Sequence, residues 1–450
     1  MNRSLLLDLY ELTMGQSYFA YKRNTRATFD LFVREYPLNR NYLVACGLED
    51  ILSYIKNLKF NRQDLVYLRR QKLFSPAFLR YLGNFRFSGE VWAMPEGEVF
   101  FPNEPLIRVT APIIEAQIIE SFLLNTINLQ TMIASKASRV VSVAQGCRLY
   151  DFSLRRTHGP EAGIKVARAA YIAGFHGTSN VLAGKLYGIP VAGTMAHSFV
   201  MSFKYEIDSF LAYANTFPGK SILLVDTYDT RNGIKNALKL GLYLKARGYR
   251  LLGIRLDSGN IAVLSKLARR LLDKAGLSYV KIFASGNLDE FKISKLLKVG
   301  ACVDSFGVGT NMGTSIDAPC LDVIYKVSEV TDATGEFFPT MKLSRAKVTY
   351  PGRKQVFRVT DKQGRFVRDI LGLADDRIRA KPLLRKIVAK GKVIYKTPPL
   401  DKIRGFLKNR LDKFPPGLKD LGAGYRYPVL VSPRLKKLQA ALARHLEKRQ

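Results

Sequence analysis

Polar residues follow a series of short apolar segments in the middle of the chain. His197 is predicted to end the strand that begins with IPVAGT, and Asp226 ends the segment SILLVD. If these segments are parallel strands, their ends meet at one edge, and the two side chains are predicted to be neighbours. A carboxylate on one imidazole nitrogen fixes the tautomer and leaves the other nitrogen nucleophilic. The pair is therefore a candidate nucleophile with its orienting group; a histidine with purely structural hydrogen bonds is the alternative.

A second pair of charged residues ends the next apolar segment, LLGIRLD. Arg255 offers a cation for a phosphate group, and Asp257 offers a carboxylate for a sugar diol or a metal ion. A surface ion pair is the alternative interpretation of these two residues.

Two glycine-containing loops end the last two apolar segments and are predicted to bind phosphate. SGN is expected to open a helix at Asn287, whose free amide groups and positive dipole end favour an anion. GVGT offers backbone amides unobstructed by side chains, and a threonine hydroxyl. Tight turns at strand ends also favour glycine, which is the alternative. The candidate phosphate contacts are Ser285, Gly286, Asn287, Gly307, Gly309 and Thr310.

These residues are positioned by a repeated strand–helix unit. The apolar segments lack polar alternation, which is typical of parallel strands buried on both faces. Seven such strands alternating with helices predict a closed or nearly closed parallel α/β barrel; an open doubly wound sheet is the alternative, although no GxGxxG follows the first strand. The predicted strands are CRLYDF (147–152), YIAGFHG (171–177), IPVAGT (189–194), SILLVD (221–226), LLGIRLD (251–257), VKIFASG (280–286) and VDSFGVG (303–309).

The two ends of the chain differ from this middle part. Residues 1–115 hold short alternating segments rich in Gly and Pro, which predict a mostly β N-terminal domain. A long helix over about 116–145 leads into the barrel domain, 116–330. Turn signals return in the basic C-terminal region, 331–450, which is expected to pack on the N-terminal domain.

Composition narrows the class of protein. No apolar run reaches the roughly 18 residues of a membrane span, and the N-terminus lacks a signal peptide, so we expect a cytoplasmic protein. The four cysteines are scattered and only four histidines occur, which argues against disulfides and histidine metal sites.

The formal net charge is +34, and residues 377–450 alone hold 21 Lys and Arg against 4 Asp and Glu. Such a surface attracts nucleic acid, acidic lipid or a small polyphosphate, or is simply a solvated lysine-rich face.

Long runs of the sequence resemble one family, the nicotinate phosphoribosyltransferases. The resemblance extends from about residue 5 to 350, and more loosely through YPVLVSPRL (427–435). It is carried by LDLYELTMG (7–15), DFSLRRTHGPEAG (151–163), GFHGTSNVLAGKLYGIPVAGTMAHSFVMSF (174–203), VDTYDTRNG (225–233), RLDSG (255–259), ASGNLDE (284–290) and DSFGVGT (304–310).

The resemblance implies an irregular, seven-stranded type II phosphoribosyltransferase barrel, with active sites shared across a homodimer. It also implies that Phe152 stacks on one face of a pyridine ring and Tyr10 of the partner chain on the other. His197 would be phosphorylated transiently by ATP, with Asp226 orienting it. Arg255 and Asp257 would hold phosphoribosyl pyrophosphate.

Further positions follow from the same resemblance. Ser179 stands where relatives that use nicotinamide have an aspartate; a carboxylate there would repel nicotinate, whereas a hydroxyl can donate to it. Arg155 and Thr178 follow other strand ends and are added as substrate-binding candidates. Two positions depart from the family pattern: Ser153 replaces a glycine, and Asn260 replaces an acid, which leaves Asp257 as the candidate Mg²⁺ ligand.

The predicted reaction joins nicotinate to the phosphoribosyl group, giving nicotinate mononucleotide and pyrophosphate with ATP as co-substrate, in the salvage of NAD. The alternatives are a nicotinamide phosphoribosyltransferase and, from another class, a basic nucleic-acid-binding protein on the same scaffold. We expect no membrane association and no nucleic-acid partner.

Overall fold

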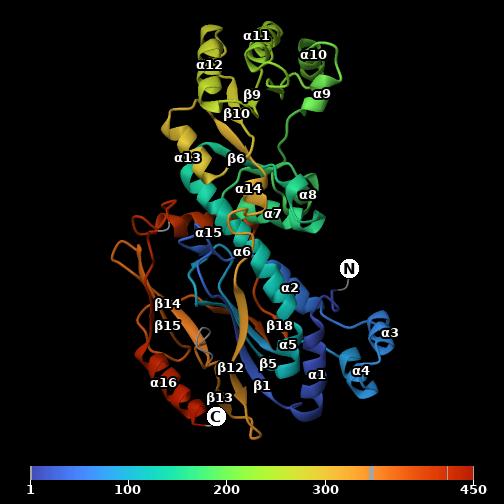
Figure 1. Ribbon diagram of the computed structural model, residues 1–450, viewed down its shortest axis with the longest axis vertical. Helices are drawn as coiled ribbons and strands as arrows, with labels where there is room; N and C mark the ends of the chain where they lie inside the picture. The colour runs from blue at the N-terminus through green and yellow to red at the C-terminus, as the bar shows by residue number, and fades with distance from the viewer. Residues whose placement is uncertain (1–2, 344–348, 423, 449–450) are drawn as a thin grey trace. The chain divides into compact units, whose positions relative to one another are not determined.

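The chain forms two compact units in a computed structural model that describes residues 3–343, 349–422 and 424–448 (Figure 1). Unit 1 combines Met1–Met132 with Cys320–Gln450, and unit 2 is Ile133–Pro319. The helix α6 (Glu120–Val143) begins in unit 1 and ends in unit 2. The three-part division at 115 and 330 that the sequence suggests stays a prediction.

Unit 1 combines helices with strands from both ends of the chain, and its neighbouring strands are antiparallel except for the parallel pair β15–β19. The helices between residues 9 and 83 correct the expectation of a mostly β N-terminal domain. Among its described residues, the largest sheet has the order β13-β12-β1-β5-β3-β17-β18, beside a sheet of order β16-β14-β15-β19 and the pair β2-β4. β1 pairs with β5 on one side and β12 on the other, and β3 pairs with β17, so segments from both ends of the chain share one sheet.

The strands of unit 1 are β1 (Arg26–Val33), β2 (Leu43–Val44), β3 (Glu90–Ala93), β4 (Val99–Phe100), β5 (Pro105–Pro112), β12 (Val323–Thr331), β13 (Phe337–Pro339), β14 (Lys354–Thr360), β15 (Phe366–Leu373), β16 (Lys381–Pro382), β17 (Arg385–Ala389), β18 (Lys392–Val393) and β19 (Val429–Val431). Its helices are α1 (Leu9–Tyr21), α2 (Leu48–Asn57), α3 (Arg62–Arg70), α4 (Pro76–Gly83), α5 (Ile113–Ile118), α15 (Leu400–Asp412) and α16 (Pro433–Glu447).

Unit 2 holds a parallel sheet with helices between its strands. Its strand order over the described residues is β7-β6-β11-β10-β9-β8, and every neighbouring pair is parallel. The strands are β6 (Arg148–Asp151), β7 (Gly177–Thr178), β8 (Ile222–Leu224), β9 (Gly253–Leu256), β10 (Lys281–Ala284) and β11 (Ser305–Val308). The helices are η1 (Leu154–Arg156), α7 (Pro160–Ala173), α8 (Val181–Tyr187), α9 (His197–Met201), α10 (Glu206–Thr216), α11 (Thr230–Ala246), α12 (Ile261–Lys274), α13 (Glu290–Lys298) and α14 (Thr310–Gly313).

The apolar pattern of the sequence accounts for the core of unit 2. Leu223, Ile254 and Ile282 from three neighbouring strands are buried in one cluster with apolar residues of α11, among them Ile234 and Leu244. Figure 1 shows α11 and α12 beside β9 and β10. No helix among the described residues combines the length and the apolar character needed to cross a membrane.

Three sequence predictions need correction here. The sheet has six named strands, because the segment 189–194 makes only an isolated parallel bridge between Val191 and Thr178. Residues 171–173 belong to α7, and only the last residue of YIAGFHG, Gly177, lies in a strand, β7. The helix after β10 begins at Glu290, because Asp289 and not Asn287 accepts the capping hydrogen bond, from the amide of Lys292.

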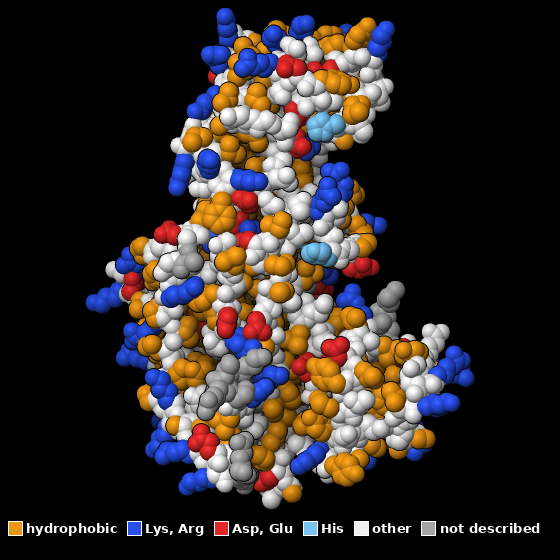
Figure 2. All heavy atoms as spheres, in the orientation of Figure 1, with side chains coloured by type: hydrophobic (Ala, Val, Ile, Leu, Met, Phe, Trp, Pro, Cys, Tyr) orange, Lys and Arg blue, Asp and Glu red, His pale blue; other side chains and the backbone are white. Residues whose placement is uncertain are grey.

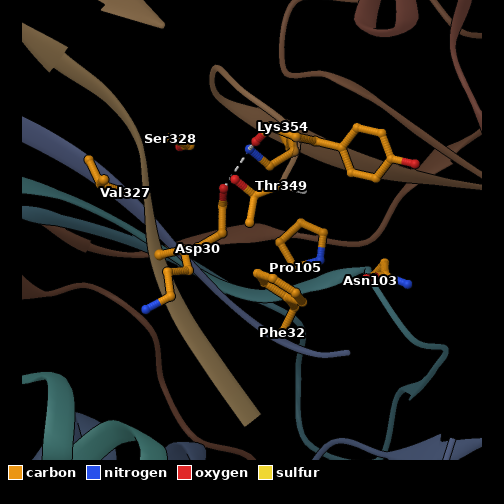
Figure 3. Close-up of a pocket in the computed structure, with 10 residues that line it drawn as sticks. Asp30, Phe32, Asn103, Pro105, Val327, Ser328, Thr349 and Lys354 are labelled. Atoms are coloured by element: carbon orange, nitrogen blue, oxygen red, sulfur yellow. Dashed lines mark hydrogen bonds and ion pairs between the residues drawn. The ribbon is translucent and has the colours of Figure 1, made fainter. Parts of the chain in front are cut away.

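Inside unit 1, a buried ion pair connects β1, from the N-terminal part of the chain, with β14, from the C-terminal part (Figure 3). Lys354 Nζ lies 2.7 Å from Asp30 Oδ2 and donates to the carbonyl oxygens of Tyr350 (2.6 Å) and Gly352 (2.8 Å). Burial lowers the pKa of Lys354, although Asp30 acts in the opposite direction. The ammonium group therefore has three acceptors in a place where an unpaired charge would be costly.

We expect Lys354→Met to destabilise the protein by about 3–5 kcal/mol, because it leaves the carboxylate of Asp30 buried without its counter-charge. Urea unfolding measures the change. Replacing the exposed Lys362 by Met is the matched control and should change stability by less than about 0.5 kcal/mol. Combining Lys354→Met with Asp30→Asn should recover part of the loss; no recovery would show that the charge is not the cause.

Candidate active site

His197 and Asp226 lie together at the carboxyl-end edge of the sheet. His197 is the first residue of α9 rather than the end of a strand, and its side chain is 42% exposed. Asp226 is buried two residues after β8, and its Oδ1 lies 3.3 Å from His197 Nε2. An ionised carboxylate only accepts hydrogen bonds, so Nε2 carries the proton and Nδ1 keeps its lone pair.

The orientation of Asp226 is fixed by its second oxygen. Oδ2 accepts hydrogen bonds from the backbone amide of Asp257 (3.1 Å) and from the hydroxyl of Ser258 (2.5 Å). Ser258 is a contact that the sequence analysis missed. The sequence shows Ser258 within RLDSG, but it does not show that Ser258 donates to the carboxylate of Asp226, which follows a different strand.

Arg255 joins three segments of unit 2 through its guanidinium group. Nε donates to Ser285 Oγ (2.7 Å), one terminal nitrogen donates to Thr194 Oγ1 (3.0 Å), and the other donates to Asp257 Oδ1 (2.6 Å). Ser285 also donates to Asp257 Oδ1. Burial by itself would raise the pKa of Asp257, but the hydrogen bond from Ser285 and the charge of Arg255 outweigh it and hold the pKa below its ordinary value.

Phe152 stands next to this cluster, beyond the end of β6. Its ring stacks on Phe283 with centroids 5.5 Å apart, and the guanidinium carbon of Arg255 lies 5.3 Å from the Phe152 centroid. Gly307 makes this arrangement possible, because a Cβ there would come within 2.7 Å of the Phe152 ring. An aromatic ring with an open face can stack on a planar ligand.

Asp151 is the main residue of the site that the sequence analysis missed. The buried carboxylate accepts hydrogen bonds from the amide (2.9 Å) and hydroxyl (2.5 Å) of Ser153 and from Thr178 Oγ1 (2.8 Å). Its carbonyl accepts from the amide of Ser179 (2.9 Å). Burial raises the pKa of Asp151, although these donors oppose the rise. Asp151 thus positions Phe152 and Ser179 together.

The two glycine loops also lie together. Asn311 donates to the carbonyl of Asn287 (3.0 Å) and to Asp289 Oδ2 (3.1 Å), so the start of α14 holds the SGN loop. Gly286 has φ of +97°, and a Cβ there would lie 2.0 Å from the carbonyl oxygen of Asp257, which excludes other residues. Gly309 precedes Thr310, the first residue of α14. Because α13 begins at Glu290, Ser285, Gly286 and Asn287 lie in the loop before the helix and not at its N-terminus.

A buried ion cluster fixes the elements behind these loops. Glu290 of α13 pairs with Lys136 (2.8 Å) and Arg139 (3.1 Å) of α6, and Lys136 also pairs with Asp317 (2.9 Å).

Two predicted site residues are not part of this arrangement. Tyr10 belongs to α1 in unit 1, where burial and Glu120 raise the pKa of its partly exposed phenol. Arg155 lies on η1 with its side chain exposed.

The described residues contain no cluster of three or more His, Cys, Asp or Glu side chains placed to hold a metal ion. On the face seen in Figure 2, Lys and Arg side chains are scattered rather than gathered into one stripe.

Fold and site together are those of an α/β enzyme whose candidate residues lie at the carboxyl ends of parallel strands. Comparison with known proteins gives the family. Residues 5–128 match the model of the nicotinate phosphoribosyltransferase N-terminal domain, residues 147–361 the family model of that name, and residues 376–439 the model of its C-terminal domain. The chain belongs to the nicotinate phosphoribosyltransferase family.

Individual relatives agree over nearly the full length. The chain is 47% identical to nicotinate phosphoribosyltransferase pncB2 of Mycobacterium tuberculosis, with 96% of this chain and 92% of that protein covered. It is 38% identical to the nicotinate phosphoribosyltransferase of Bacillus subtilis, with 95% and 93% covered. The crystal structure of human nicotinic acid phosphoribosyltransferase superposes with a TM-score of 0.87 at 29% identity, covering 97% of this chain and 99% of that one.

We expect Arg255→Lys to loosen the site, because one ammonium group cannot reach the three acceptors of the guanidinium fork. Loss of these hydrogen bonds should lower the free energy of unfolding by roughly 2 kcal/mol. Arg270→Lys, on the exposed face of α12, is the control.

The same variant should raise the pKa of Asp257 towards its ordinary value, which a carbon-13 NMR titration of labelled aspartate carboxyls measures. A lowered folded-state pKa gives stability that is present above the ordinary aspartate value of 3.8 and is lost as the pH falls through the folded-state pKa. Arg255→Lys should therefore weaken the acid dependence of stability. An unchanged Asp257 titration would contradict this role.

Proposed function

We propose that this protein transfers the phosphoribosyl group of phosphoribosyl pyrophosphate to the ring nitrogen of nicotinate, with coupled hydrolysis of ATP. The products are nicotinate mononucleotide and pyrophosphate, and the reaction belongs to the salvage of NAD. The full-length family match supports this function, and the observation that carries it is the His197–Asp226 pair beside the Arg255 cluster and the glycine loops.

The acceptor would bind between the ring of Phe152 and the hydroxyl of Ser179. Stacking on Phe152 gains about 1 kcal/mol beyond burial and leaves the pyridine nitrogen free to attack. A serine hydroxyl can donate to the carboxylate of nicotinate, which favours the acid over nicotinamide. Asp151 supports both contacts through Ser153, Thr178 and the amide of Ser179.

ATP would be coupled to this transfer through His197. The lone pair of Nδ1 attacks the γ-phosphorus, the bond to the β-phosphate oxygen breaks, and ADP leaves. Water later cleaves the labile phosphorus–nitrogen bond. Asp226 stabilises the positive charge that the ring acquires, because its Oδ1 accepts from Nε2. Attack of the pyridine nitrogen on the ribose carbon removes no proton, so no general base is needed there.

The phosphoribosyl donor would lie against Arg255, Asp257 and the two glycine loops. Arg155 and Thr178 complete the proposed substrate contacts, with Thr178 acting through Asp151. Mg²⁺ is often held by one or two carboxylates together with substrate phosphates. Asp257 fits this mode, because within the described chain no group donates to its Oδ2. When bound, Mg²⁺ would neutralise charge on the pyrophosphate.

Three further features belong to the same proposal. The parallel sheet of unit 2 would form an irregular barrel in which the segment 189–194 acts as a seventh strand through its bridge to β7. Two chains would form a homodimer in which Tyr10 of the partner chain covers the free face of the acceptor ring. The location would be cytoplasmic, on the sequence grounds given above.

The function is tested by measuring nicotinate mononucleotide formation from nicotinate, and the corresponding product from nicotinamide, each with and without ATP. We expect ATP-stimulated turnover with nicotinate and little with nicotinamide. Preference for nicotinamide would favour the sister activity, and no turnover with either would contradict the proposal.

His197→Asn should reduce ATP hydrolysis to background and leave a slow, ATP-independent transfer at high substrate concentration, because the variant lacks only the phosphoryl acceptor. Asp226→Asn should lower ATP-coupled turnover by roughly 10- to 100-fold, because the tautomer is disturbed while the nucleophile remains. His158→Asn, an exposed histidine of the same unit, is the control. ATP-stimulated turnover by His197→Asn would rule out the phosphohistidine.

A shared site predicts complementation between two inactive variants. Tyr10→Ala and Asp257→Ala each damage a different half of the site, so heterodimers should contain one intact site. Mixing the two variants should restore up to about a quarter of wild-type activity, because random pairing makes half the dimers mixed and each has one of two sites intact. Subunit exchange is confirmed by native mass spectrometry; exchange without recovered activity would argue against a shared site.

A further inference from the structure

The inner face of the parallel sheet in unit 2 lines a cavity of about 580 Å³. Side chains alternate across a strand, so residues two apart share a face. Arg148 and Tyr150 of β6, and Phe152 beyond its end, all line the cavity, and so do Lys281 and Phe283 of β10. The volume lies within the range of about 300–1,000 Å³ of small-molecule sites.

Small residues of β11 and of the segment 189–194 leave space for the cavity. The interior of a parallel barrel is normally filled by large branched residues. Here β11 lines the cavity with the small side chain of Ser305. The segment with Ala192 and Gly193 lines the opposite side, again with small residues.

The cavity has two chemically different ends. One end reaches Phe152 and Thr194, next to the candidate active site. The other lies at the amino ends of the strands, where Arg148, Lys281 and Asp304 line it. Nζ of Lys281 pairs with Asp304 Oδ1 (2.9 Å), and Oδ2 of Asp304 accepts from the amide of Ile282 (2.9 Å).

Arg148 supplies an uncompensated positive charge at that end. Its side chain is exposed, and across the described residues its guanidinium group has no hydrogen-bond or ion-pair partner. With Lys281 balanced by Asp304, the net charge of these three groups is positive. A guanidinium fork matches a carboxylate in geometry and charge.

Aromatic rings connect the two ends. Tyr150 stacks on Phe283 with centroids 5.8 Å apart and an interplanar angle of 29°, and Phe283 stacks in turn on Phe152. A planar ring can therefore enter the cavity and stack on these aromatic walls.

We propose that the amino end of this cavity is a second binding site for a small aromatic monocarboxylate, beside the active site with which the cavity shares Phe152 and Thr194. The carboxylate pairs with Arg148, and the ring lies against Tyr150 and Phe283. Nicotinate and unreactive aromatic acids such as benzoate share this chemistry. The proposal stands on the cavity and does not depend on the transferase reaction.

Calorimetric titration with benzoate, in the absence of phosphoribosyl pyrophosphate and ATP, tests the site. Arg148→Gln should weaken benzoate binding by about 10-fold or more, the usual effect of losing a charged hydrogen-bond partner. Arg270→Gln, an equal loss of charge on the outer helix α12, should leave binding unchanged. Benzamide has no carboxylate, and its binding should not respond to Arg148→Gln.

A variant that fills the cavity provides an independent check should Arg148→Gln fail to fold. Ser305→Val places two methyl groups inside the cavity and should also weaken benzoate binding by about 10-fold. If wild type binds two molar equivalents of nicotinate and Arg148→Gln binds one, the substrate itself occupies the site. If benzoate binds at the site but a second equivalent of nicotinate does not, the site belongs to other aromatic acids. Benzoate binding that is equal in wild type and in all these variants would overturn the proposal.

A crystal structure with 4-bromobenzoate locates the ligand through anomalous scattering. We expect bromine density among Tyr150 and Phe283 with the carboxylate at Arg148. Density only beside Phe152 and Ser179 would place the ligand in the active site and overturn the proposal. Density at the expected place without any calorimetric signal would mean binding at crystal concentration only, and would also overturn the proposal. None of these outcomes involves turnover, so the absence of transferase activity would leave this test intact.

Discussion

The fork of hydrogen bonds from Arg255 is the interaction on which the candidate site depends. Parallel strands bring their carboxyl ends to one edge of a sheet, but they do not hold the loops beyond those ends in a fixed arrangement. The three nitrogens of Arg255 do so, because they bind Thr194, Asp257 and Ser285 on three different segments. The backbone amide of Asp257 then holds Asp226, so the constraint reaches His197.

This connected network also explains how two chemical tasks can share one edge. The proposed phosphoryl acceptor, His197, needs a fixed tautomer and an accessible nitrogen, which Asp226 provides from a buried position. The proposed glycosidic step needs binding groups and no base, which suits Arg255, the glycine loops and Phe152. The two tasks use different residues, yet they meet at Asp257 and Ser258, whose amide and hydroxyl hold the same oxygen of Asp226. Phosphorylation of His197 would therefore act, through Asp226, on Asp257 and Ser258 in the loop proposed to bind the phosphoribosyl donor.

Small residues serve both the site and the cavity. Gly307 of β11 lets Phe152 and Phe283 stack, while Ser305 and Gly193 line the cavity and leave the inside of the sheet partly empty. An unfilled interior forgoes dispersion contacts. Unit 2 compensates in the layer between its sheet and its outer helices, where Leu223, Ile254 and Leu244 are buried completely or nearly so. The outer layer thus stabilises the fold while the inner face stays available for ligands.

The sequence by itself indicated five of the strands, their parallel arrangement and the edge on which the candidate residues lie, because buried parallel strands leave continuous apolar runs and polar ends. It also brought His197 to Asp226 and grouped Arg255 with Asp257. It failed at the start of α13 and at the segments 171–177 and 189–194. At α13, the hydrogen bonds of Asn311 to Asn287 and Asp289 are tertiary contacts that no local pattern shows.

Only the tertiary structure revealed Asp151, Ser258 and Asn311 as supports of the site. Each acts through a hydrogen bond to a residue on another strand end or loop, and no local pattern marks such a partner. The same holds for the cavity, since a sequence shows that Ser305 and Gly307 are small but not which large neighbours surround them. Periodicity is a property of one segment and is visible in its residues. The filling of space and the pairing of polar groups depend on which segments meet, and that is decided only when the chain has folded.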